Sequence, residues 1–166
     1  KRGRVIRHIL FFFISNKRMS SHNPDGYNTW FEKFDVTRFL KYIGLIKYDT
    51  SDIGIPLKII IRRLTTIQKD EERVLTIIKH LSSAFDKIED ESTKCQVLSN
   101  VYIWGAKNKY DDTFFKHIKS QLDETWEGID SPWLKVIIGY EIAKSLSRIS
   151  LKLESREYVE KTRKYR

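Results

Sequence analysis

Apolar residues recur at spacings of three and four along most of the chain after residue 25, and this spacing gathers them on one face of an α-helix. Asp35 precedes the first such run, and Gly44 follows it at a position suited to a left-handed C-terminal cap. These signals predict a short helix between the two residues.

Two further helices are predicted up to Ile88. Residues 52–56 have the composition of a turn, and the apolar positions of 57–68 then follow helical spacing, which favours helix over strand for this isoleucine-rich run. Residues 70–72 are all acidic and suit the first turn of a helix, where the helix dipole stabilises negative charge. The apolar stripe behind them extends to Ile88, so we expect one helix from 70 to 88.

Two more predicted helices follow, one opened by Ser92 and one by Asp111, both of which are residue types that cap helix N-termini. The first should close at residues 105–108, and the second should end near Gly128. Both carry their apolar residues on one side, so both should pack on a common core.

The last predicted helix has the clearest start, with Ser131 at the capping position and Pro132 at the first helical position. Its apolar stripe continues without interruption through residues 134–153. We therefore expect one continuous helix across these positions, which projects or frays toward Arg166.

Six helices joined by short loops predict an all-α fold, a compact bundle or array of about six helices. No internal period of roughly 33–45 residues is firm enough to predict a solenoid. A chain of 166 residues is long enough for one domain, which we place at 27–166 with a basic C-terminal end, after a basic N-terminal extension at 1–26.

The formal net charge of +9 is concentrated at the two ends of the chain. Residues 1–18 hold six Lys or Arg and no acid, and residues 144–166 hold eight Lys or Arg and three Glu, which leaves −2 for residues 19–143. Basic ends on a nearly neutral body are expected for contacts with phosphate, acidic protein or an anionic surface, and charge kept for solubility is the alternative. Met19 is the only methionine, so one hypothesis is that the native chain starts there.

The cysteine and the apolar runs indicate the cellular setting. Cys95 has no second cysteine to pair with and no Cys/His cluster around it, so we expect neither a disulfide nor a zinc site, and a reducing, cytoplasmic location. The longest apolar run, 9–14, is shorter than the roughly 18–20 residues that span a bilayer. A membrane-surface role for residues 4–18, where apolar and basic positions mix, stays an alternative.

No catalytic constellation is recognisable in the sequence. The four histidines lie far apart, and no phosphate-binding loop, nucleophile elbow or dinucleotide fingerprint occurs. Glu141 lies in an apolar turn, where a buried carboxylate could be functional, but Lys144 at i+3 offers it a salt bridge. We therefore predict a protein that is not an enzyme and has no catalytic residue, metal site, cofactor or small-molecule substrate.

Basic side chains supply the strongest functional signal. Lys144, Arg148, Lys152 and Arg156 recur every four residues, so on a continuous helix they would form one row beside the apolar stripe. Successive members would rise about 6 Å apart, close to the phosphate spacing of a nucleic-acid strand. An ordinary solvated face is the alternative.

Further cations and one aromatic residue are candidates for the same surface. Tyr110 is near enough in the sequence to stack on a base. The additional cations are Arg62, Arg63, Lys107 and Lys109. No signature of base-specific recognition accompanies them, so contacts to the nucleic-acid backbone are expected.

Two short motifs resemble those of a known family. Val101-Tyr102-Ile103-Trp104-Gly105-Ala106-Lys107 is similar to a Val-Tyr-x-x-Gly-basic pattern with one additional residue before the basic position, and Ile138-Gly139-Tyr140 is similar to an Ala-Tyr pair in a last helix, with glycine in place of alanine. With the order of elements across 50–148, they resemble the small all-helical subunit of type III CRISPR effector complexes. The family's Thr-Thr-Ser start is only echoed by Thr50-Ser51. The resemblance implies a non-catalytic subunit of an antiviral complex that contacts the backbone of a guide RNA–target duplex, with Lys107 as the transferable position.

We therefore predict a non-catalytic helical subunit that binds the backbone of RNA or DNA within a larger nucleoprotein assembly and contacts its other protein subunits. The alternative is a protein–protein interaction adaptor with no nucleic-acid role, anchored by exposed aromatics such as Trp126 and Trp133 near the Gly128 loop. The first prediction requires that residues 144–156 form one continuous helix whose four cations are not paired with acids.

Overall fold

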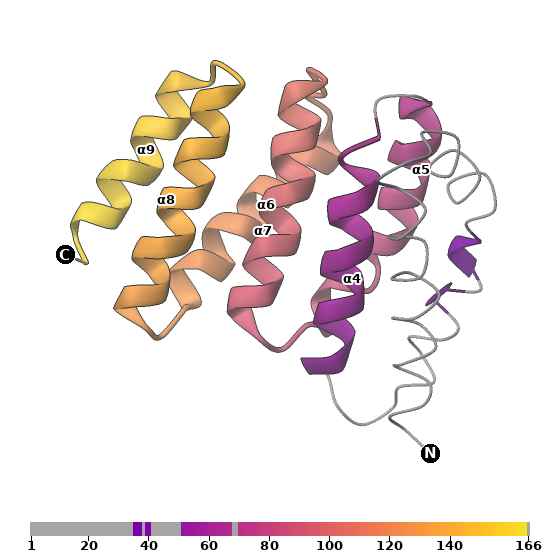
Figure 1. Ribbon diagram of the computed structural model, residues 1–166, viewed down its shortest axis with the longest axis horizontal. Helices are drawn as coiled ribbons and strands as arrows, with labels where there is room; N and C mark the ends of the chain where they lie inside the picture. The colour runs from indigo at the N-terminus through magenta and orange to yellow at the C-terminus, as the bar shows by residue number, and fades with distance from the viewer. Residues whose placement is uncertain (1–34, 38, 41–50, 68–69, 166) are drawn as a thin grey trace, which may run out of the picture.

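The computed structural model describes residues 35–37, 39–40, 51–67 and 70–165. All regular structure in these residues is helical, which confirms the all-α prediction (Figure 1). The elements are α4 (Ser51–Leu64), α5 (Glu71–Ser82), the 3-10 helix η1 (Phe85–Lys87), α6 (Glu91–Lys107), α7 (Thr113–Gly128), α8 (Pro132–Arg148) and α9 (Lys152–Arg163).

The predictions for the N-terminal part fall mostly outside the described residues. These are the basic extension at 1–26, the start at Met19 and the membrane-surface segment at 4–18. Of the helix predicted after Asp35, residues 36–37 and 39–40 are described, and they are helical.

The six α-helices form three antiparallel hairpins, α4–α5, α6–α7 and α8–α9, which stack side by side (Figure 1). The first helices of the hairpins run in the same direction, and each packs against the next. They begin at Ser51, Glu91 and Pro132, which are 40 and 41 residues apart. The described chain is thus a helical array with a period of about 40 residues that is not apparent in the sequence, and each hairpin buries its apolar face against its neighbours.

Aspartate and serine side chains cap four of these helices at their N-termini. Each side chain accepts a hydrogen bond from the backbone N–H of the third helical residue. The caps are Asp70 for α5, Asp90 for α6, Asp112 for α7 and Ser131 for α8. Ser131 is therefore confirmed, whereas Ser92 and Asp111 were wrongly predicted as caps, because an aspartate lies close to each of them and takes the capping position.

Two boundaries in the first hairpin also differ from the predicted ones. Residues 52–56 belong to α4 and not to a turn, and Pro56 lies inside the helix. α5 ends at Ser82 and does not continue to Ile88. The chain passes through η1 instead, and it still brings the side chains of Phe85 and Ile88 into the core.

The predicted continuous last helix is wrong, because the chain reverses at residues 149–151 and forms two helices. Ser150 has a φ of 68°, and the N–H groups of Ser150 and Leu151 donate to carbonyls in the last turn of α8. This is the Schellman arrangement, which ends a helix and turns the chain back. α9 then packs antiparallel along α8 (Figure 1).

Helix α6 lies close against a side chain of α7 at Gly105. A Cβ added there would overlap the ring of Phe115, a residue that is 3% exposed. The Phe115 ring cannot retreat easily, because Trp104 and Tyr110 lie against it with ring centroids 6.3 and 5.4 Å away. The missing side chain of Gly105 therefore sets the distance between the two helices of the central hairpin.

Gly105→Ala should lower the free energy of unfolding by about 1–3 kcal/mol, because the added methyl group must displace a buried ring. Urea denaturation followed by circular dichroism measures this change. Gly128→Ala is the matched control, since Gly128 is exposed and an added Cβ there would meet only the flexible side chain of Glu91. Equal stability of the Gly105→Ala variant and the unmodified protein would contradict this packing of α6 on α7.

Candidate nucleic-acid-binding face

The four cations predicted to form one row lie on two helices. Lys144 and Arg148 belong to α8, whereas Lys152 and Arg156 belong to α9, beyond the reversal. A four-residue spacing produces a row only while the helix continues, so the turn at Ser150 breaks it. The condition that the nucleic-acid prediction placed on residues 144–156, one continuous helix, is therefore not met. All four side chains are exposed, and none of them forms an ion pair with another described residue.

The parallel direction of α4, α6 and α8 brings other predicted cations to one edge of the array, where these helices end (Figure 1). The cations in their last turns are Arg62 and Arg63 of α4, Lys107 of α6 and Arg148 of α8. Lys109 follows α6 with a φ of 61°. The acidic caps Asp70 and Asp112 start α5 and α7 at the same edge, so it carries both signs of charge. The cations there also stabilise the helix C-termini, which explains them without a ligand.

A polar groove of about 370 Å³ opens between α4, α6 and α8, and we call it the three-helix groove. Its walls are Lys58 and Arg62 of α4, Gln96, Ser99, Asn100 and Ile103 of α6, and Ile138, Glu141, Ile142 and Ser145 of α8. Arg62 is the predicted site residue that lines it directly. Lys144 and Arg148 follow on α8, three residues after Glu141 and Ser145.

One residue of the groove lining, Gln96, carries a hydrogen-bond acceptor that no described residue satisfies. The side-chain Oε1 of Gln96 is buried and has no partner among the described residues. The neighbouring Ser99 Oγ and Asn100 Nδ2 both donate to the backbone carbonyl of Gln96, at 3.0 and 2.8 Å. A buried acceptor without a donor costs about 1–3 kcal/mol.

Two cations and one carboxylate define the charge of the groove. Lys58 and Arg62 lie one turn apart on α4, and neither forms an ion pair within the described part of the chain. Glu141 is exposed, and the salt bridge predicted between it and Lys144 is not formed. Lys58 was missed in the sequence, although its position four residues before Arg62 places both on one helix face.

A second hollow of about 320 Å³ lies on the outward face of α8, beside α9, and we call it the α8–α9 hollow. Its lining is Trp133, Val136, Ile137, Tyr140, Glu141 and Lys144 of α8 with Thr162 of α9. Trp133 is 70% exposed and Tyr140 is 56% exposed. Trp126 is fully buried and its Nε1 donates to the Lys135 carbonyl at 3.0 Å, so it belongs to the core and cannot be an anchor of the alternative adaptor function.

The aromatic ring of Tyr110 is part of the core packing. It stacks against Trp104 and Phe115, with ring centroids 5.5 and 5.4 Å away, and it is partly buried. These contacts give the ring a packing role, and base stacking by Tyr110 stays a prediction.

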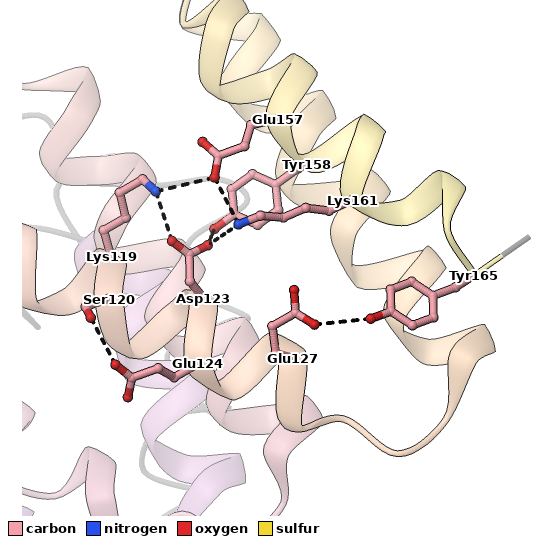
Figure 2. Close-up of polar contacts among 9 residues, drawn as sticks. All are labelled: Lys119, Ser120, Asp123, Glu124, Glu127, Glu157, Tyr158, Lys161 and Tyr165. Atoms are coloured by element: carbon pink, nitrogen blue, oxygen red, sulfur yellow. Dashed lines mark hydrogen bonds and ion pairs between the residues drawn. The ribbon is translucent and has the colours of Figure 1, made fainter.

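A network of polar side chains ties α9 to α7 (Figure 2). Asp123 of α7 accepts a hydrogen bond from Lys119 of the same helix at 2.9 Å. From α9 it accepts two more, from Tyr158 at 2.8 Å and from Lys161 at 3.0 Å. Glu157 of α9 completes the network through ion pairs with Lys161 at 2.9 Å and Lys119 at 3.8 Å.

These contacts fix the charge states of the network near neutral pH. Burial by itself would raise the pKa of Asp123, but the hydrogen bonds that it accepts outweigh burial and hold the pKa below its usual range. Burial and the Asp123 carboxylate raise the pKa of Tyr158, so the phenol stays protonated and donates a hydrogen bond to Asp123. Burial opposes the charge of Lys161, yet its hydrogen bonds to Glu157 and Asp123 raise its pKa.

Three further observations concern reactive groups and membranes. Burial, together with the charge of Asp123, raises the pKa of Cys95 to about 12, so its thiol stays protonated. Within the described ranges, no group of three or more His, Cys, Asp and Glu side chains is placed to hold a metal ion. No helix in the described part of the chain combines the length and the apolar character needed to cross a membrane.

No protein-family model, curated protein or solved structure matches this chain. The resemblance to the small subunit of type III CRISPR complexes therefore stays a prediction. The residues that carry it have packing roles, since Gly105 lies against Phe115 and Gly139 lies against Thr162 and Trp126. Lys107 is exposed in the last turn of α6.

Asp123→Asn should lower the free energy of unfolding by about 1–3 kcal/mol at neutral pH, because a neutral amide replaces the charged acceptor of three hydrogen bonds. The pKa of Asp123 is lower in the folded chain than in the unfolded chain. Its contribution is therefore complete above the ordinary carboxyl pKa of about 4 and is lost as the pH falls through the lower folded value. Urea unfolding of both proteins across neutral and acidic pH measures this difference.

Glu124→Gln is the matched control on the same helix, since Glu124 is exposed and accepts its hydrogen bond from Ser120 of α7 itself. The difference between Asp123→Asn and the unmodified protein should shrink below about pH 4. A difference that stayed constant down to the most acidic conditions would show that the Asp123 charge does not hold α9.

Proposed function

We propose that this protein is a non-catalytic helical subunit that binds single-stranded nucleic acid along the three-helix groove, within a larger cytoplasmic nucleoprotein assembly. The observation that carries the proposal is the pair Lys58 and Arg62, which have no acidic partner among the described residues and line a polar groove. Phosphate groups are the natural partners of such cations, because charge-assisted hydrogen bonds are about twice as strong as neutral ones.

The reversal at residues 149–151 favours a single strand over a duplex. Tracking a duplex backbone along the last helix would have required an unbroken row of cations, and the chain divides that row between α8 and α9. A single strand instead requires a positively charged groove and polar groups that reach the exposed base edges. Lys58 and Arg62 supply the charge, and the amides of Gln96 and Asn100 supply the polar groups.

The architecture supports the same proposal by analogy. Stacked hairpins present equivalent side-chain positions at regular intervals, and some helical repeat proteins use two or three side chains per repeat to bind one base of RNA. The resemblance to type III CRISPR small subunits also points to a non-catalytic nucleic-acid-binding subunit. The groove residues carry the proposal, and both likenesses are secondary to them.

A second candidate function is a protein-interaction adaptor, and the exposure of Trp133 favours it. Tryptophan is among the residue types that contribute most to the binding energy of protein interfaces, and this side chain is 70% exposed beside the α8–α9 hollow. The hollow and the three-helix groove share Glu141 but are otherwise lined by different residues, so one subunit can use both.

Replacing the four cations in and beside the groove with glutamine should weaken binding of a fluorescent poly(U) oligonucleotide by roughly tenfold or more, because phosphate contacts are lost. The four cations are Lys58, Arg62, Lys144 and Arg148. Affinity falls with salt, and each lost contact to a single strand makes the slope of log affinity against log salt less steep by about 0.7, so the loss of four contacts makes it less steep by about 3. Fluorescence anisotropy over a salt series measures both quantities, with circular dichroism to verify the fold.

Two control variants separate the groove from net charge. The first replaces four exposed cations outside it with glutamine: Lys87, Lys116, Arg163 and Lys164. It removes the same charge and should retain most of the affinity. The second, Glu141→Gln, removes the carboxylate from the groove wall and should tighten binding. Equal weakening by the two four-residue variants would show that net charge alone attracts the oligonucleotide, and the proposal would fail.

A further inference from the structure

The α8–α9 hollow corresponds to a surface that a helix covers one hairpin earlier in the array. α6 and α8 begin 41 residues apart, at Glu91 and Pro132. The α6 residues that line the groove shared with α8 are Gln96, Ser99, Asn100 and Ile103. The positions 41 residues later are Ile137, Tyr140, Glu141 and Lys144, and all four line the α8–α9 hollow.

The equivalent positions are buried or half-buried on α6, where α8 covers them, and half-buried or exposed on α8, where no described helix covers them. Ser99 is 9% exposed, whereas its equivalent Tyr140 is 56% exposed. Cys95 is fully buried, whereas its equivalent Val136 is only half-buried. Two of the α8 positions are larger and more apolar than their α6 counterparts, Ile137 in place of Gln96 and Tyr140 in place of Ser99, whereas Glu141 and Lys144 place charge at one end of the surface. The open surface thus combines an apolar part that is suited to burial with a charged end.

We propose that the α8–α9 hollow binds an amphipathic helix of a partner protein, which lies along α8 as α8 lies along α6. The packing of α6 on α4 and of α8 on α6 continues in one direction, and the hollow is the next position in that series. Trp133, Ile137 and Tyr140 follow one face of α8 and would pack between the apolar side chains of the incoming helix.

The charge at the hollow specifies the flanks of the partner helix. Glu141 and Lys144 both line the hollow, and Arg148 follows Lys144 one turn later, so this end carries two cations and one acid. Neither cation is paired with an acid in the described part of the chain. Charges across an interface are normally complementary. The partner helix should therefore carry Asp or Glu beside its apolar stripe, at the end that reaches Lys144. This inference does not depend on nucleic-acid binding by the groove.

A displayed library of helical peptides with a fixed apolar stripe and variable flanking positions tests the proposal on the full chain. We expect selected peptides to be enriched in acidic flanking residues. Their affinity should fall by roughly tenfold or more in a Trp133→Ala/Tyr140→Ala variant, because both anchors are lost. An Ile55→Ala/Leu153→Ala variant is the matched control, since these residues are 50% and 78% exposed and lie outside the hollow.

The same two double variants distinguish a partner helix from other possible occupants of the hollow. If no peptide is selected, or if both double variants lose affinity equally, the proposal is wrong. Sedimentation velocity would detect self-association, and its loss in Trp133→Ala/Tyr140→Ala would assign the hollow to a second copy of this chain. Loss of poly(U) binding in that variant without any peptide binding would assign the two rings to base stacking, which would also overturn the proposal.

Discussion

The half-buried carboxylate of Asp123 ties the last helix to α7. Burial makes the charge of a carboxylate unfavourable unless donors surround it, and α9 supplies two of the three donors, Tyr158 and Lys161. Apolar contacts act in the same place, since Tyr158 is fully buried against Trp126, and Val159 and Tyr165 pack on the core. With α9 held along α8 and tied to α7, the α8–α9 hollow remains open.

The helical periodicity predicted most of the helices, because apolar positions at spacings of three and four depend on local chain geometry. It did not predict the reversal at residues 149–151, since Leu146, Ile149 and Leu153 keep helical spacing across it. The residue with positive φ is Ser150 and not a glycine, so no local signal marked the turn. The 40-residue period was hidden for a similar reason, because burial recurs at equivalent positions while the residue types change.

The candidate site was predictable only as a set of exposed cations. Their grouping depends on the path of the chain, which divides Lys144 and Arg148 from Lys152 and Arg156 and adds Lys58 to Arg62. The positions of Trp126 and Trp133, the two tryptophans near Gly128, also depend on the path of the chain and could not be predicted from the sequence. Gly139 admits the ring of Trp126 into the core, while Trp133 of α8 is 70% exposed. Under the two proposals, the groove would bind a nucleic acid and the hollow a helix, so the subunit would join a nucleic acid to a protein.

The distance between the start of α8 and the end of α9 tests this account most directly. Spin labels at Trp133→Cys and Lys164→Cys would report it by pulsed electron paramagnetic resonance, because the native Cys95 is buried. Two antiparallel helices with axes about 8–10 Å apart predict a distribution centred below roughly 30 Å. One continuous helix would separate the labels by about 47 Å, and a distribution centred there would contradict the fold-back of α9 and the surfaces that depend on it.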